Sequence, residues 1–428
     1  MNIRNILTGT FALATLVTSV KADAEIRVTG ATAFRAAATS AIRAQFALGG
    51  NYQYAHNQTA GGVIGCDRVS FRGSFPGISG TTIVRVSWNG SVEGVRAIAL
   101  GGTHNPGFIQ DAAFVTAAAP AGGETFSVAT QTTQLAKFAF SDVRQTSTPV
   151  ASPVLNPSDA SVGITTFALL ANESTSITNL TNVTAQQFKA LFVLGKLPLS
   201  VFTGNVADTI NVYASGRNDG SGTRTTYMAE SGLGITTLVN QFVATASTGT
   251  DITVIRKAPS TATLGAGTFA STLWAQDTDG NGGYVSGSAL RGDFGKTSNS
   301  LQILDADGSE LEPAGTNVAL VTFLSTPDAR TAASNGGKIL GWNGYGLTSL
   351  QTSSTLSTAD RDAIAEGRYT AWSFQQFYYS GSLGGDETTF DTAIRAGIPT
   401  NLLPSRLNGL PLTEMHVGRA DDGAPVAP

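Results

Sequence analysis

A strand that runs into a glycine-rich loop and then into a helix is the feature that most constrains what this chain can fold into. The segment 209–214, TINVYA, has the β-branched and aromatic composition of a strand, and 224–229 has helical character. The loop between them, 216–223, reads GRNDGSGT. The first N–H groups of a helix lack backbone partners and the helix dipole favours negative charge, so this order of elements suits a small anion. Taken singly, the loop is equally compatible with an ordinary polar turn.

The same order of strand, small-residue turn and helix recurs along the chain. A strand is predicted at 25–29, a turn at 30–34 and an Ala-rich helix at 35–48, with apolar residues at every fourth position. This alternation predicts the α/β class, with mostly parallel sheets flanked by helices. Further strands are predicted at 81–88, 135–140, 163–171 and 318–323, and further helices at 92–100, 184–194, 235–243 and 387–396.

Three segments lack this regularity. Residues 49–80 carry clusters of turn-forming residues and are expected to form a loop-rich insertion. Residues 265–300 are rich in Gly, Ser and Thr and are also expected to be a loop. The tail from residue 418 is polar and ends in Pro, so it is predicted to be loosely held.

The composition is that of a globular chain with a sizeable core, since 41% of its 428 residues are hydrophobic. Only 13% are charged and the formal net charge is −4. A chain of this charge has no extended basic field, so no nucleic-acid partner is expected. Any anion that binds here must be held by a local site.

The N-terminal residues 1–24 have the features of a secretory signal peptide. Arg4 precedes an apolar run at 6–20, and the sequence ADA at 22–24 fits a small-x-small cleavage site. The apolar run is too short and too interrupted for a membrane anchor. Cys66 is the only cysteine, so neither an intramolecular disulfide nor a lipid-attachment cysteine at the mature N-terminus is expected. We expect a soluble, monomeric protein exported to the periplasm or outside the cell.

Four loops are expected to meet at one place. In α/β sheets, ligands bind outside the carboxyl ends of the strands, where the loops between strands and helices converge. The loops at 30–34, 89–91, 141–142 and 217–223 fit that description. Together they supply helix N-termini, several hydroxyl groups, one arginine and one carboxylate. This combination predicts an oxyanion site.

These loops resemble, in sequence and in order, those of the periplasmic phosphate-binding proteins of ABC transporters. The segment RNDGSGT at 217–223 is similar to that family's Arg-x-Asp-Gly-Ser-Gly-Thr signature, and VTGATAF at 28–34 resembles its Gly-Ala-x-x-Phe turn. GSVEGV at 90–95 resembles its Gly-Ser-Ser-Gly-Gly-Val loop, and FSD at 140–142 its Ala-Ser-Asp segment. The resemblance extends from residue 25 to about residue 232.

The resemblance implies the two-lobe fold of the periplasmic substrate-binding protein superfamily, of the type II kind, with a hinge between the lobes. The first lobe would combine residues 25–162 with 380–428, and the second would comprise 163–379. The ligand would be inorganic phosphate or a related oxyanion, and the partner an ABC transporter permease.

The resemblance also implies the roles of the site residues. Phe34 would contribute its backbone N–H, Arg217 would make charge-assisted hydrogen bonds while held by Asp219, and Asp142 would accept the ligand's proton. Hydrogen phosphate has such a proton and sulfate does not, and a buried acceptor without a donor costs about 1–3 kcal/mol, so Asp142 would favour phosphate. The complete implied set is Thr32, Ala33, Phe34, Ser91, Asp142, Arg217, Asp219, Ser221, Gly222 and Thr223.

The sequence departs from the family pattern at several positions. Ala33 stands where the family places Thr or Ser before the Phe, although Thr32 offers a hydroxyl nearby. Glu93 follows the glycine-pair loop and brings a carboxylate towards the expected anion site. The segment 49–80 has no counterpart in a minimal phosphate receptor.

A calcium site and an enzymatic function have less support from the sequence. The segments 277–282 and 305–308 resemble the start of a calcium loop, but the twelfth position of the first is Ser288 rather than Glu, so no metal is expected. A secreted phosphoesterase could use Ser91 or Ser221 as nucleophile. It would lack a base, because His56, His104 and His416 are scattered and read as ordinary loop or surface residues.

A further alternative is a surface binding protein with the same fold and no transport role. In such a protein the aromatic run at 369–379 could be a contact patch, although core or hinge packing explains it better. The sequence thus predicts a binding protein that is not an enzyme and needs no cofactor. It would capture phosphate between two lobes and deliver it to a transporter.

Overall fold

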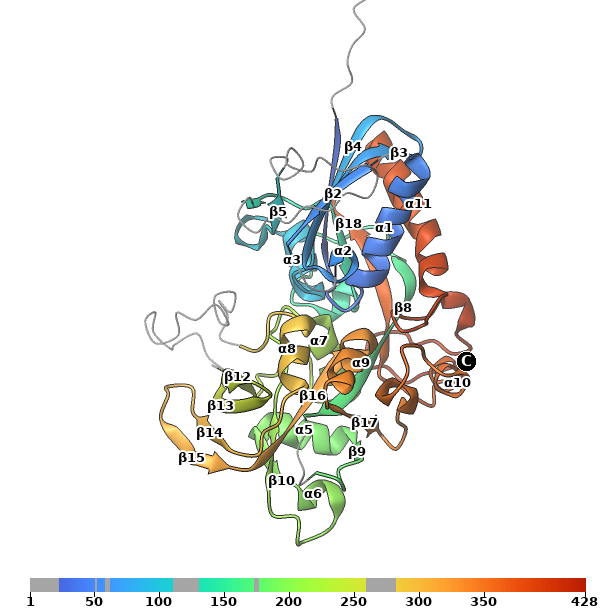
Figure 1. Ribbon diagram of the computed structural model, residues 1–428. Helices are drawn as coiled ribbons and strands as arrows, with labels where there is room; N and C mark the ends of the chain where they lie inside the picture. Colours follow the sequence, from blue (N-terminus) through green and yellow to red (C-terminus); the bar gives the residue numbers. More distant parts are fainter. Residues whose placement is uncertain (1–22, 51, 58–61, 111–130, 173–176, 259–281) are drawn as a thin grey trace, which may run out of the picture.

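The computed structural model describes residues 23–50, 52–57, 62–110, 131–172, 177–258 and 282–428. The predicted signal peptide lies almost entirely outside these residues, and so does most of the calcium-like segment 277–282. Figure 1 shows two α/β halves, one above the other. Each half has its own large hydrophobic core.

The first lobe is built on three parallel strands. β1 (Ala24–Gly30) pairs in parallel with β4 (Ile78–Ser87) on one side and with β7 (Phe138–Ser141) on the other. Two helices from opposite ends of the sequence, α1 (Arg35–Gly49) and α11 (Gly385–Leu402), pack side by side on this sheet (Figure 1). Further elements of this lobe are β2 (Tyr52–His56), α2 (Gly62–Gly65), β3 (Arg68–Phe75), α3 (Ser91–Ala99), β5 (Gly107–Ile109) and β6 (Gln131–Thr133).

The second lobe is centred on β16 (Val318–Ser325), which is buried along its whole length. It pairs in parallel with β11 (Asn211–Ala214) and antiparallel with β8 (Ser161–Ala171). The continuous apolar run VALVTFLS suits a central strand that is covered on both faces. The surrounding elements are β9 (Asn182–Val183), α5 (Ala185–Leu194), β10 (Lys196–Pro198), α6 (Ser200–Thr203), α7 (Gly222–Glu230), α8 (Gly287–Phe294), α9 (Thr326–Ser334), β17 (Lys338–Trp342) and α10 (Thr358–Ala365).

A smaller four-stranded sheet lies beside the second lobe. Its strands run in the order β12 (Phe242–Thr248), β13 (Asp251–Lys257), β14 (Leu301–Leu304) and β15 (Glu310–Thr316). Short 3-10 helices occur in connecting segments at Gly102–His104, Gln145–Ser147, Thr348–Gln351 and Leu412–Glu414.

Two antiparallel strands connect the lobes. β18 (Trp372–Tyr379) pairs with β8 near Thr166, and its last residues pair with β7 of the first lobe. The remainder of β8, from Phe167 onwards, pairs with β16 of the second lobe. The aromatic residues of β18 are largely buried between these neighbours, which agrees with core packing.

The expected α/β class with two lobes is confirmed, but the large sheet is mixed. Parallel pairs occur at the centre of each lobe, between β1 and its neighbours and between β11 and β16. The connecting strands β8 and β18 pair antiparallel, and so do β3 and the edge strand β2. The sequence does not predict these strand directions, because the residues of a strand that connects two lobes have the same composition whether it pairs parallel or antiparallel with its neighbours.

Several predicted elements are wrong. The segment 49–80 is not a loop, since β2 and β3 extend the first sheet and bury Tyr54 and Phe71. Residues 235–241 form no helix and lead into β12, so their apolar spacing reflects burial in irregular backbone. The predicted loop at 265–300 contains α8 within its described part.

Two predictions about exposure are also wrong. His56 is not a surface residue, because it is fully buried in β2. The tail from residue 418 is held in place, since Arg419 is buried. Within the C-terminal segment, α11 packs against α1 of the first lobe, whereas Leu410 and Val426 pack with the larger core of the second lobe.

Candidate functional site

The loops before α3 and α7 meet directly across the two lobes. The backbone N–H groups of Val92 and Glu93, in the first turn of α3, donate to the carbonyl of Gly220 at 3.0 and 3.3 Å. A Cβ added at Gly222 would lie 2.6 Å from Ser91 Oγ, and one at Gly90 would lie 2.4 Å from the Gly220 carbonyl oxygen. Only glycine permits this close approach, so these glycines let the two helix N-termini face each other.

Asp142 lies at the centre of this contact. It follows the last residue of β7 and is buried. Its carboxylate accepts hydrogen bonds from the hydroxyls of Ser91, in the first lobe, and Thr223, in the second, the latter at 3.3 Å. Burial raises the pKa of Asp142, and the hydrogen bond from Ser91 and the charge of Arg217 oppose that rise. The site therefore contains a buried acceptor that hydroxyls from both lobes surround.

Arg217 is buried close to this acceptor. Its Nε donates to the carbonyl of Tyr284 at 2.9 Å, Nη2 to that of Val285 at 3.0 Å and Nη1 to Thr32 Oγ1 at 3.2 Å. Burial lowers the pKa of Arg217 to about 10, and the carboxylates of Asp328 and Asp142 oppose that shift. The guanidinium thus stays charged at neutral pH and spans the two lobes through Thr32.

The predicted role of Asp219 is wrong. Asp219 does not hold Arg217 but accepts a hydrogen bond from Arg96 Nη2 of the first lobe at 2.8 Å. The backbone carbonyls that hold Arg217 come from residues 284 and 285, which lie in the segment predicted to be a loop. Backbone acceptors carry no residue-type signal, so the sequence could not reveal them.

The remaining predicted residues lie either at the start of α7 or in the cores of the two lobes. Ser221 is the N-cap of α7, and its Oγ accepts from the N–H of Arg224 at 3.3 Å, while Gly222 and Thr223 begin the helix. The N–H of Phe34 donates to the carbonyl of Ala31 at 3.3 Å, and its ring packs in the first core. Ala33 is buried against the second core.

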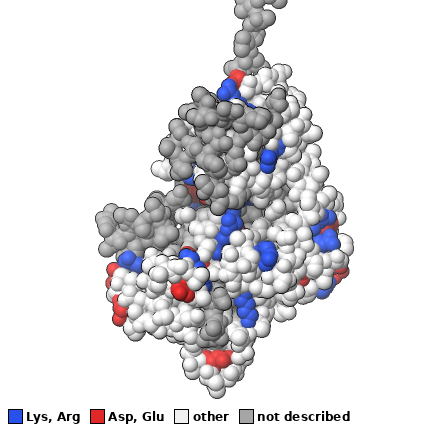
Figure 2. Space-filling view, viewed as in Figure 1, with Lys and Arg blue, Asp and Glu red and all other residues white. Residues whose placement is uncertain are grey.

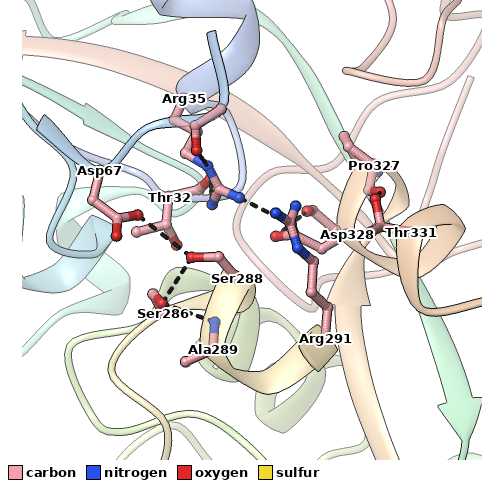
Figure 3. A network of polar contacts seen from close by, with 12 residues as sticks. Thr32, Arg35, Asp67, Ser286, Ser288, Ala289, Arg291, Pro327, Asp328 and Thr331 are labelled. Atoms are coloured by element: carbon pink, nitrogen blue, oxygen red, sulfur yellow. Dashed lines mark hydrogen bonds and ion pairs between the residues drawn. The ribbon is translucent and has the colours of Figure 1, made fainter. Parts of the chain in front are cut away.

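Beside this site, a second polar network joins the lobes (Figure 3). Asp328 of α9 pairs with Arg35 of α1 at 3.0 Å and with Arg291 of α8 at 2.7 Å. Ser288 Oγ, in α8, donates to Asp67 of the first lobe at 3.4 Å. Burial alone would raise the pKa of Asp328, but the two guanidinium groups hold it below its usual range.

The sequence does not predict this network. Its one sequence signal is Arg35, the charged residue among the buried positions of an Ala-rich helix. Its ion-pair partner Asp328 lies about 290 positions further along the chain, and Arg291 pairs with the same carboxylate, so no local pattern connects these residues. The network adds a charged contact across the lobes directly next to Thr32.

The carboxylate of Glu93 faces away from Asp142. It accepts a hydrogen bond from Arg96 at 3.3 Å and lies 2.9 Å from His104 Nδ1. Glu93 lines a separate polar cavity of about 390 Å³ together with Arg68, Arg96 and Asp219. Its charge is thus balanced by neighbouring cations, so the Glu93 departure from the family pattern does not add a free carboxylate to the Asp142 site.

The described part of the chain contains no group of three or more His, Cys, Asp or Glu side chains placed to hold a metal ion. In the calcium-like turn 305–308, Asp307 accepts hydrogen bonds from the N–H and hydroxyl of Ser309. Among the described helices, none is both long enough and apolar enough to cross a membrane. The face shown in Figure 2 is mostly uncharged, with Lys and Arg in small separate groups.

Two α/β lobes share a connecting strand pair, and the N-termini of their helices α3 and α7 meet between them. Solved structures of phosphate-binding proteins are similar to this chain. The first is a putative phosphate ABC transporter substrate-binding protein with bound phosphate from Clostridium perfringens, with TM-score 0.39 and 10% identity over 91% of this chain and 99% of the other.

Two other solved structures are similar to this chain to the same degree. An ABC-type phosphate transport receptor from Vibrio cholerae has TM-score 0.39 and 12% identity, covering 89% of this chain and 97% of the other. A high affinity periplasmic phosphate-binding protein bound with phosphate has TM-score 0.39 and 12% identity, covering 91% of each chain. No protein-family model and no curated protein matches the sequence.

Proposed function

We propose that this protein is an exported binding protein that captures an inorganic oxyanion, phosphate, between its two lobes and delivers it to an ABC transporter. The observation that carries the proposal is the buried carboxylate of Asp142, which hydroxyls from both lobes approach beside the charged group of Arg217. A carboxylate in that position repels an anion unless the anion brings a proton.

Hydrogen phosphate meets this requirement. Its P–OH group would donate to the Asp142 carboxylate, and the hydroxyls of Ser91 and Thr223 would turn from Asp142 to the phosphate oxygens. The N–H groups at the start of α7, at Gly222 and Thr223, would donate to the same oxygens. Sulfate offers no proton at neutral pH, so it would leave Asp142 without a donor, which costs about 1–3 kcal/mol.

Arg217 would supply the positive charge. Three of its N–H groups donate to protein atoms, and within the described part of the chain two remain for the ligand. Because the guanidinium is already fixed by two carbonyls, little conformational freedom is lost when it binds an oxyanion. Binding would therefore depend on preorganised donors rather than on a large excess of positive charge.

Ligand entry requires the lobes to separate, because Gly222, Ser91 and Asp142 are in contact. Such opening would be a rotation about β8 and β18. The N-terminal sequence at 1–24 supports export, and a binding protein of this kind would present its closed form to a membrane permease.

The experiment that tests the proposal is calorimetric titration of the mature protein, freed of ligand by unfolding and refolding. Phosphate is expected to bind in the micromolar range or tighter, and sulfate at least about 5-fold more weakly, as the cost of about 1–3 kcal/mol for an unpaired Asp142 implies. Sulfate serves as the control, since it matches phosphate in shape. Absence of phosphate binding by the refolded protein would overturn the proposal, and equal affinity for both anions would remove Asp142 from it.

A further inference from the structure

The C-terminal segment 418–427 folds back across both lobes. The N–H of Gly418 donates to the carbonyl of Ala427 at 2.7 Å, and the N–H of Ala427 donates back to Gly418 at 2.9 Å. These two bonds close the segment into a compact loop. Side chains of this loop contact two segments that lie far apart in the sequence, residues 144–147 and the end of α7.

Two residues of the loop, Arg419 and Gly423, contact the second lobe. The buried guanidinium of Arg419 pairs with Glu230, the last residue of α7, and lies 4.1 Å from the ring centroid of Trp372. Gly423, at φ +73°, rests on Ala229, so that an added Cβ would lie 2.6 Å from Ala229 Cβ. The segment is thereby seated on the C-terminal end of the helix whose first turn carries Gly222 and Thr223.

Asp421 and Asp422, which lie between Arg419 and Gly423, contact the first lobe. The carboxylate of Asp422 accepts a hydrogen bond from the N–H of Arg144 at 2.7 Å. Asp421 accepts from the hydroxyls of Thr146 at 3.2 Å and Ser147 at 3.4 Å. Arg144, Thr146 and Ser147 lie two to five positions after Asp142, so the same short loop contacts the chain on both sides of the candidate site.

We propose that residues 418–427 are a clasp that ties the segment after Asp142 to the end of α7 and holds the two lobes closed. Two connecting strands alone allow one lobe to rotate against the other. The clasp adds contacts beyond those strands, and opening of the lobes must break its bonds on one side. Once a ligand has entered between the separated lobes, the clasp lowers the free-energy cost of closing them around it, which increases the apparent affinity.

The closed state can be measured without any ligand. Leu48 in α1 of the first lobe is 75% exposed and Val206 in the second lobe is 90% exposed, so cysteines at these positions can carry spin labels. Burial raises the pKa of the Cys66 thiol to about 12, which keeps the native cysteine unreactive. Double electron–electron resonance then reports the distance between the lobes.

The clasp variants are Arg419→Ala, the isosteric pair Asp421→Asn with Asp422→Asn, and Gly423→Val. Each is expected to convert a single narrow distance distribution into a broader one with a longer mean. The control is Arg368→Ala, which removes an exposed ion pair with Glu366 in the second lobe and should leave the distribution unchanged. Unchanged distributions in all three clasp variants would overturn the proposal.

Hydrogen exchange provides a second measurement that does not depend on the labels. In the Asp421→Asn, Asp422→Asn protein, the amides of residues 144–147 should exchange at least about 10-fold faster, while those of α1 and α5 keep their wild-type rates. Uniformly faster exchange would indicate general destabilisation and would overturn the specific clasp. The inference uses the proposed function only for its effect on affinity, and a protein that binds no phosphate would still pass or fail both tests.

Discussion

Replacement of Arg217 by alanine should abolish most oxyanion binding. The guanidinium is buried, and three of its N–H groups are used by Tyr284, Val285 and Thr32, so two are left for a ligand. A hydrogen bond that involves a charged group contributes about 1.5–3 kcal/mol. Loss of two such bonds costs about 3–6 kcal/mol, which corresponds to a Kd roughly 10² to 10⁴-fold higher.

The assay is calorimetric titration with phosphate, supported by circular dichroism to show that the variant is folded. Arg217→Lys should recover only part of the affinity, because an ammonium keeps the charge but cannot form the planar fork. Arg291→Ala is the matched control, since Arg291 pairs with Asp328 in the neighbouring network and has no predicted ligand contact. A folded Arg217→Ala protein with wild-type affinity would refute the assignment of the site.

Three further predictions follow from the buried carboxylates. Asp142→Asn should narrow the ratio of phosphate to sulfate affinity, because an amide can donate to sulfate; an unchanged ratio in parallel titrations would contradict this. Asp328→Ala should lower the free energy of unfolding by about 3–5 kcal/mol in urea denaturation, because Arg35 is left buried without its partner; a loss under about 1 kcal/mol would contradict it. Burial raises the pKa of Asp422 to about 6, and Asp421 adds to the rise, so the folded state holds a proton that the unfolded chain releases. Protonation of Asp422 should therefore add up to about 3 kcal/mol to the free energy of unfolding. This contribution should be complete below about pH 4 and should be lost as the pH rises through about 6. Asp422→Asn should remove that dependence, and an identical pH profile in the variant would exclude Asp422 as its source.

The parts of the fold that local pattern controls were predictable. Strand β1, helix α1 and the turn between them follow from β-branched residues, small residues and fourfold apolar spacing within one stretch. The helix α5 begins where Thr184 and Gln187 form a capping box, which is also a local signal. Strands β2 and β3 were missed because polar residues and Gly73 interrupt their alternation, and only the pairing of β3 with β4 and of β2 with β3 makes them strands.

The candidate site also has features that local sequence predicts and features that only tertiary packing sets. The sequence by itself determined the strand–loop–helix units and the chemistry that they carry, because such loops are defined by consecutive residues. Only the tertiary structure decided that Arg96 rather than Arg217 pairs with Asp219, that carbonyls of residues 284 and 285 hold Arg217, and that residues 418–427 cross both lobes. These contacts join residues up to about 280 positions apart, and their partners are set by how the lobes pack, which no local pattern records.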